Sequence, residues 1–567
     1  MSHRISGPAL PVVVALIAAQ CFQANALAAA SLPPPATIHW SACSADLVSE
    51  EWTAAWSGRL ECGSMRAPLS YARPESGYVD VTVLRVKAGV PAERQGAIFF
   101  NFGGPGAHPA DYLPLTAATW NLASANSVID GDKRRLADRY DLVAVVPRGL
   151  KGPSFDPCGN APGLGSGPDP IIDLADWNWA GFVRDAREFA RRCGSQAMAR
   201  YAGTRAHVLD MEHARRSLGE PVLNYIGVSY GSWVGYRYAV LFPEHMGRFV
   251  LDSSMDVTAT VEQIHETLPA VAQDLFERHV IRQVLTMPAY GVTEPDTKAV
   301  MTRLNGIAAH ARRAWMTRMQ TPEDLAAVLT LGRWIDDERQ MWLDGEHWDT
   351  VGARLRTRAE AHRFSTVSGV DTAIRTAAES FIDMLRPSDE TDDGRRIGTY
   401  LAATCGDTPW TKSIRQWRAT AQWTAARYPV KGGGGVMTGL ICHHWPVDAV
   451  DAFPVPGLIA APPMLLVHAE HDAATPLAGA RRTLEALPSA RMIVSRGMLG
   501  HGVFGMSGTP CVEKGVGRYL LTGVLPPARS TVCDFRPSPP SRRIREPGAW
   551  PTTGDLHEAL RLRLQRS

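Results

Sequence analysis

Short apolar runs that alternate with helical patterns are the feature that most limits how this chain can fold. Strands that are buried on both faces read as nearly continuous apolar runs, and parallel strands need a crossover, usually a helix, between them. A helical stretch such as residues 176–193 separates most of the runs, and residues 78–88 alternate like a half-buried strand. The sequence therefore predicts an α/β fold with a mostly parallel sheet flanked by helices. The runs lie at residues 97–102, 141–146, 222–227, 248–252, 464–469 and 491–495.

The strand pattern disappears between about residue 257 and residue 428. This region is rich in alanine, arginine, glutamate, leucine and tryptophan, so we expect a large helical cap inserted between two parts of one sheet. The predicted divisions are a signal peptide (1–30), the first part of the core (31–256), the helical cap (257–428), the second part of the core (429–536) and a Pro/Arg-rich tail (537–567).

The N-terminus has the features of a signal peptide. Residues 9–19 form an apolar segment that is too short to span a bilayer comfortably, and small residues near positions 26–30 offer cleavage sites of the A-x-A type. No later run is long and apolar enough to suggest a transmembrane helix. We therefore expect a secreted or periplasmic protein without stable membrane insertion.

The charge balance argues against a nucleic-acid partner. Lysine and arginine together number 59 and aspartate and glutamate 57, and the arginines are spread along the chain. No whole-protein field of one sign is therefore expected to attract nucleic acid or an anionic membrane.

Export would favour disulfides among the cysteines. Removal of a signal peptide that contains Cys21 leaves eight cysteines, which allow many pairings. No cysteine couple has the spacing of a zinc site, so no metal is expected. The eight fall into near-neighbour couples along the chain, which favours the pairs Cys43–Cys62, Cys158–Cys193, Cys405–Cys442 and Cys511–Cys533.

A serine between two glycines ends the run at residues 222–227. The pattern G-x-S-x-G at residues 227–231 follows an apolar strand and opens a helix pattern with small residues. This context is typical of the nucleophile elbow of an α/β-hydrolase, in which a tight turn exposes the serine. Ser229 is the predicted nucleophile.

A serine hydroxyl needs a base, and the base needs an acid that orients it. In this fold the acid and then the histidine follow the serine along the chain, each on a loop after a later strand. Asp472 follows the run at 464–469, and His501 lies in a glycine-flanked loop after the next run. Glu470, His471 and the pair His443–His444 are rival candidates nearby.

The tetrahedral intermediate needs backbone N–H groups for its oxyanion. Tyr230, directly after the nucleophile, supplies one, and the loop after an early strand supplies the other. The glycine-rich stretch at residues 103–106 lies there, and we assign the second donor to Gly104. This chemistry uses no cofactor.

The motifs resemble those of the secreted tripeptidyl aminopeptidases and prolyl-aminopeptidase-like enzymes, serine peptidases of the α/β-hydrolase fold. The resemblance implies a triad of Ser229, Asp472 and His501, with Gly104 and Tyr230 in the oxyanion hole. The chain departs from the family at Val146, where aspartate is usual, and at residues 107–108, where Gly-Ser is common. The shared segments are residues 103–106, 140–149, 227–252, 442–446, 471–476, 500–502 and 511–533.

The resemblance implies an exported aminopeptidase that acts on peptides with a free N-terminus. Such an enzyme needs a carboxylate for the α-ammonium, and the candidates in the cap are Asp407, Glu338, Asp336 and Asp337. A carboxylesterase or lipase for small esters would use the same triad and is the alternative. A non-catalytic binding protein is disfavoured because serine, aspartate and histidine are all present.

Overall fold

The computed structural model describes most of the chain between residues 32 and 535. The predicted signal peptide (1–30), the predicted tail (537–567) and Glu338 lie outside the described residues. The described residues are 32–56, 58–150, 158, 171, 173–194, 199–337, 348–385, 390–432, 434–447, 455–505 and 508–535.

Ten strands in the described part of the chain form a single sheet. They are β1 (Ile38–Ser41), β2 (Leu60–Pro68), β3 (Tyr78–Val86), β4 (Gly96–Asn101), β5 (Tyr140–Val145), β6 (Leu223–Val228), β7 (Met246–Asp252), β8 (Leu465–His471), β9 (Arg491–Leu499) and β10 (Ser530–Asp534). Their order in the sheet is β1-β2-β3-β5-β4-β6-β7-β8-β9-β10. Strands β1, β2, β3 and β5 pair antiparallel, and all other pairings are parallel. The predicted α/β-hydrolase fold with a mostly parallel sheet is confirmed.

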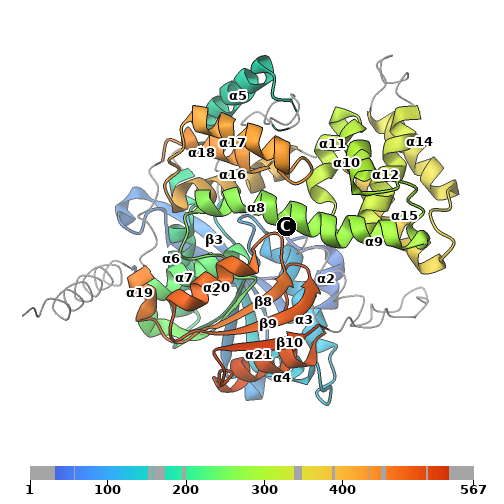
Figure 1. Ribbon diagram of the computed structural model, residues 1–567. Coiled ribbons are helices and arrows are strands. Elements are labelled where there is room, and N and C mark those ends of the chain that lie inside the picture. The colour runs from blue at the N-terminus through green and yellow to red at the C-terminus, as the bar shows by residue number, and fades with distance from the viewer. Residues whose placement is uncertain are drawn as a thin grey trace, which may run out of the picture.

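Helices cover both faces of the sheet, and each face has its own apolar cluster (Figure 1). Every residue of β4 and β5 is buried between them, which is why these strands are continuous apolar runs. One face carries α3 (Pro109–Asn121), α4 (Gly131–Arg139) and α21 (Pro510–Thr522). The other carries α6 (Thr204–Ser217), α7 (Tyr230–Leu241), α19 (Val455–Ile459) and α20 (Leu477–Ala486).

The described residues between β7 and β8 form helices and connecting loops without a strand. Figure 1 shows α8 and α9 as one long rod that crosses above the sheet, with a π-helical turn at Phe276–Ile281 between them. Helices α10 to α15 share one apolar cluster beyond that rod. The helices are α8 (Val261–Leu275), α9 (Arg282–Thr286), α10 (Thr297–Gly306), α11 (Ala309–Trp315), α12 (Pro322–Asp337), α14 (Trp348–Ala361), α15 (Ser368–Asp383), α16 (Glu390–Asp407), α17 (Ile414–Arg427) and α18 (Gly434–His443).

One helix from the first part of the chain packs with the inserted helices. Helix α5 (Asp176–Gly194) lies against α18 and shares an apolar cluster with α16, α17 and α18 (Figure 1). The layer above the sheet is therefore built from segments on both sides of the nucleophile in the sequence. A further short helix, α2, spans Glu50–Ala55. Single 3₁₀ turns lie at Pro74–Ser76, Pro91–Glu93, Ala199–Tyr201, Pro243–His245, Pro288–Tyr290 and Met316–Arg318.

All four predicted disulfides are present. The pair Cys405–Cys442 joins α16 to α18, and Cys511–Cys533 joins α21 to β10. The other two pairs are Cys43–Cys62 and Cys158–Cys193.

None of the helices in the described residues is long and apolar enough to cross a membrane. Within the same residues, no group of three or more potential metal ligands lies together.

Candidate active site

Ser229 occupies a sharp turn between β6 and α7. It has φ 59° and ψ −124°, a conformation that non-glycine residues rarely adopt and that costs about 1–3 kcal/mol. The flanking glycines are required by close backbone contacts. A Cβ atom on Gly227 would lie 2.4 Å from the carbonyl oxygen of Gly231, and one on Gly231 would lie 2.4 Å from that of Asn101. The turn is therefore the strained strand-to-helix elbow that the sequence predicts.

Asp472 and His501 form a direct hydrogen-bonded pair. Nδ1 of His501 lies 2.8 Å from Oδ2 of Asp472 and 3.0 Å from Oδ1. Asp472 also accepts hydrogen bonds from the backbone N–H groups of Ala474 and Thr475 and from the Thr475 hydroxyl. These contacts hold the carboxylate in one orientation, so that Nδ1 carries the proton and Nε2 keeps its lone pair.

Electrostatics keeps this pair ready to act as a base. Burial alone would raise the pKa of Asp472, but the charge of His501 and its hydrogen bond lower it to about 2. Burial would lower the pKa of His501, and the charge and hydrogen bond of Asp472 outweigh this and raise it. Asp472 is therefore ionised at neutral pH and favours an imidazolium when His501 takes a proton.

The glycine loop after β4 lies against the elbow. A Cβ atom on Gly103 would lie 2.9 Å from Cβ of Ser229 and 3.2 Å from the nitrogen of Tyr230. The N–H of Gly103 donates to Oδ1 of Asn101 over 2.9 Å, so this N–H already has an acceptor. Gly104 is the next residue in the loop, with φ 96°. Tyr230 is the first residue of α7, so its N–H group has no acceptor within the helix.

Asn101 is itself held by a buried histidine. Its Nδ2 lies 3.0 Å from Nε2 of His207, and burial lowers the pKa of His207 to about 4. His207 is therefore neutral, and its Nε2 accepts the hydrogen bond from Asn101. The orientation of the glycine loop thus depends on two polar side chains that were not predicted from the sequence, although Asn101 lies within a predicted strand and ends β4.

Asp407 contacts the elbow through Tyr230, but its carboxylate is buried. Its Oδ2 accepts hydrogen bonds from the hydroxyls of Tyr230 and Thr204, and only 1% of the residue is exposed. Burial raises the pKa of Asp407 to about 6, with the Tyr230 hydrogen bond acting in the opposite direction. In this structure the predicted ammonium partner therefore holds the side chain of Tyr230.

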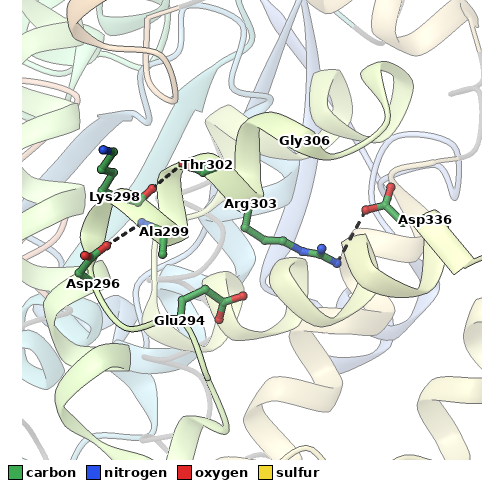
Figure 2. Close-up of a pocket in the computed structure, with 8 residues that line it drawn as sticks. All are labelled: Glu294, Asp296, Lys298, Ala299, Thr302, Arg303, Gly306 and Asp336. Atoms are coloured by element: carbon green, nitrogen blue, oxygen red, sulfur yellow. Dashed lines mark hydrogen bonds and ion pairs between the residues drawn. The ribbon is translucent and has the colours of Figure 1, made fainter.

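Two of the other acidic candidates, Asp336 and Asp337, lie at the end of α12. Asp336 and Asp337 form ion pairs with Arg303 and Arg358. Asp336 also lines a hollow of about 560 Å³, in which its ion pair with Arg303 spans α10 and α12 (Figure 2). The hollow is lined by Glu294, Asp296, Lys298, Ala299, Thr302, Arg303, Gly306 and Asp336, and it contains none of the triad residues. We do not assign the chemistry to it.

The rival candidates for the triad have other partners. Glu470 accepts a hydrogen bond from the N–H of Gly497, and the ring of His471 lies 4.5 Å from that of His279, centroid to centroid. His443 and His444 lie at the end of α18 with their rings 4.8 Å apart. Only His501 among these histidines is hydrogen-bonded to Asp472.

The chain is similar to several known hydrolases. The family model described as TAP-like protein matches residues 428–533, which include Asp472 and His501. A tripeptidyl aminopeptidase of Streptomyces coelicolor is 27% identical over 514 residues, which cover 88% of this chain and 86% of that protein. The chain is an α/β-hydrolase that is similar to the tripeptidyl aminopeptidases.

Two further relatives bear on its chemistry. The serine protease Hip1 of Mycobacterium tuberculosis is 27% identical over 208 residues, 36% of this chain and 37% of that protein. A carboxylesterase B of the same species is 26% identical over 491 residues, 82% of this chain and 85% of that protein. The chain is thus similar both to a protein named as a serine protease and to one named as a carboxylesterase.

Proposed function

We propose that the chain is an exported serine aminopeptidase that releases short N-terminal peptides, of the tripeptidyl or prolyl type, through an acyl-enzyme on Ser229. The observation that carries the proposal is the bonded pair of Asp472 and His501 at the same end of the sheet as the strained Ser229 turn. The similarity to a tripeptidyl aminopeptidase over 88% of the chain supports the substrate class.

The mechanism follows from the roles of these groups. Nε2 of His501 takes the proton of the Ser229 hydroxyl as Oγ attacks the carbonyl carbon of the substrate. The N–H groups of Gly104 and Tyr230 stabilise the oxyanion that forms. His501 then gives its proton to the leaving amine, and a water molecule hydrolyses the ester on Ser229 by the same steps in reverse order. Asp472 stays ionised throughout and stabilises the imidazolium.

The inserted helices support a preference for chain ends. A Cβ atom on Gly106, in the glycine loop, would lie 3.1 Å from the carbonyl oxygen of Arg396 on α16. Helix α16 therefore packs directly on the loop that carries the proposed oxyanion donor. A wall at this position limits how many residues a substrate can extend past the nucleophile on that side.

The four disulfides support export, because such bonds persist outside the reducing cytosol. The expected destination is the periplasm or the extracellular medium.

Hydrolysis of matched substrates tests the proposal. We expect rapid cleavage of a tripeptide chromogenic amide with a free N-terminus and a rate lower by about tenfold or more for its N-acetylated form, because acetylation removes a charge that a carboxylate would bind. The Ser229→Ala variant should remain folded and cleave neither. Equal rates on the free and acetylated amides would contradict the aminopeptidase.

The alternative is a carboxylesterase, which the similarity to carboxylesterase B favours. A short-chain ester belongs in the same assay for this reason. Efficient ester hydrolysis with no amide cleavage, abolished by Ser229→Ala, would establish the esterase in place of the aminopeptidase.

A further inference from the structure

The loop after His501 is fastened to the end of β7 by three consecutive backbone N–H groups. The N–H of Gly502 donates to Oγ of Ser253 over 2.8 Å. The N–H of Val503 lies 3.0 Å from both carboxylate oxygens of Asp252, and that of Phe504 lies 2.7 Å from Oδ2. Two adjacent side chains thus bind the three residues that directly follow the catalytic histidine of the proposed mechanism.

The same two residues also bind the other two triad segments. The carbonyl oxygen of Asp252 accepts the N–H of Ser229 over 2.9 Å. The N–H of Ser253 donates over 2.8 Å to the carbonyl oxygen of Val467, on the strand that leads to Asp472. All three triad segments therefore meet at one dipeptide.

The local backbone is shaped for this contact. Besides Ser229, Ser253 is the only non-glycine residue in the described part of the chain with a positive φ, here 52°. Such a backbone conformation is strained, and it is typical of sites where the surrounding contacts fix the backbone. Both side chains are closed to solvent, with 1% of Asp252 and none of Ser253 exposed.

The histidine loop needs such an anchor. Gly500, Gly502 and Gly505 all have positive φ. Because glycine has wide conformational freedom, ordering this loop costs more conformational entropy than ordering a loop of other residues. Hydrogen bonds from N–H groups to a buried carboxylate are stronger than those to a neutral acceptor. Asp252 is thus suited to hold residues 502–504 in one conformation.

We propose that Asp252 and Ser253 are positioning residues that fix the His501 loop relative to Ser229. The inference rests on the proposed triad. A shift of about 1 Å in a catalytic group can reduce the rate about a hundredfold, while the binding of substrate elsewhere in the site is unaffected. Loss of this positioning is therefore expected to lower kcat and to leave KM unchanged.

The test compares three variants of the full-length protein. Asp252→Asn keeps the shape of the side chain but replaces one acceptor oxygen by a donor that faces a backbone N–H. We expect kcat to fall about tenfold to a hundredfold with KM unchanged, and labelling of Ser229 by a fluorophosphonate to slow by a similar factor. Ser253→Ala removes one anchor and should lower kcat by a smaller factor, which keeps the inference testable if Asp252→Asn does not fold.

Asp256→Asn is the matched control. Asp256 is also a buried carboxylate just after β7, but it binds Arg482 and Thr258 instead of the histidine loop. Its loss should lower the melting temperature while kcat stays within about twofold of the wild type. An unchanged kcat in folded Asp252→Asn and Ser253→Ala, or an equal loss in Asp256→Asn, would overturn the inference.

The outcomes also separate this inference from the proposed function. A wild-type protein that a fluorophosphonate does not label at Ser229 would contradict the triad. A wild-type protein that is labelled at Ser229, together with Asp252→Asn labelled equally fast, would contradict the anchor alone.

Discussion

At the scale of single residues, the proposed mechanism makes the activity depend on the protonation of His501. Burial opposes a proton on His501, but the charge and hydrogen bond of Asp472 prevail and raise the pKa above that of a free histidine. The base is competent only when Nε2 is unprotonated. Activity should therefore increase as the pH rises through this raised pKa, on the alkaline side of 6.5.

Replacing the carboxylate should move that pH dependence in a defined direction. In Asp472→Asn the negative charge is gone, so the pKa of His501 falls and the acid limb of kcat/KM shifts to lower pH. At the same time kcat should drop by about 10⁴-fold, because the amide no longer holds the productive tautomer. Profiles of kcat/KM against pH with an activated ester measure both effects. An acid limb that stays in place would show that Asp472 does not control His501.

Burial also affects the protonation of Asp252, which binds the histidine loop. Burial raises the pKa of its carboxyl to about 7, while the N–H groups of Phe504 and Val503 oppose the rise. Protonation removes the negative charge and turns one acceptor oxygen into a donor, so the hydrogen bonds of Asp252 to the histidine loop weaken as the pH falls towards and below 7.

At the scale of elements, α16 is the inserted helix that contacts the proposed active site. It contacts the glycine loop through the carbonyl oxygen of Arg396 and the elbow through Asp407. Two residues before Asp407, Cys405 ties α16 to α18. The bridge therefore fixes the end of α16 that contacts Tyr230, the proposed oxyanion donor, through Asp407.

Removing that bridge should affect stability and turnover together. The pair Cys405–Cys442 closes a loop with a sequence separation of 37, and its loss should cost about 3–4 kcal/mol in the chain-entropy model. We expect Cys405→Ser/Cys442→Ser to lower both the melting temperature and kcat. The control is Cys511→Ser/Cys533→Ser, which opens the bridge between α21 and β10 and should lower the melting temperature alone. Equal kcat in the two double variants would contradict a link from α16 to the elbow.

The elements that the sequence predicted are those with a strong local pattern. Strands β4 and β5 are buried along their whole length and read as unbroken apolar runs. Strand β10 was not predicted, because it is a short edge strand with Ser530, Val532 and Asp534 exposed and no apolar run. The packing of α5 on α18 was not predicted either, since contacts between segments so far apart leave no periodic signal in the chain.

The same limit applies to the active site. Ser229, Asp472 and His501 were predicted as a set because the elbow motif and the order of post-strand loops are local features. Asn101 and Asp252 each lie within a predicted strand, but their roles depend on a histidine and a loop distant in the sequence. Asp407 was predicted to face the substrate, whereas it is buried beneath Tyr230 by the fold of α16 onto α6 and α7.

At the scale of the whole molecule, one buried arginine joins the antiparallel part of the sheet to α6 and to the inserted helix α16. Arg148 donates to both carboxylate oxygens of Asp210 on α6 over 2.7 Å. It also donates to the carbonyl oxygens of Pro68 and Leu69 at the end of β2. The hydroxyl of Thr399 on α16 in turn donates to the carbonyl oxygen of Arg148. The guanidinium is 1% exposed, so these contacts form away from water.

A double-mutant cycle tests how far this arginine stabilises the fold. Arg148→Met leaves the carboxylate of Asp210 buried without its cation and should lower the free energy of unfolding by about 3–5 kcal/mol. Asp210→Leu alone should be similarly harmful, because it leaves the guanidinium unpaired. The double variant Arg148→Met/Asp210→Leu should be more stable than the sum of the two losses predicts, since no lone charge remains in the interior. Arg191→Met, at an exposed arginine paired with Glu188, should change little and serves as the control. Urea denaturation of the four variants measures the coupling, and strictly additive losses would mean that Arg148 and Asp210 stabilise the protein independently.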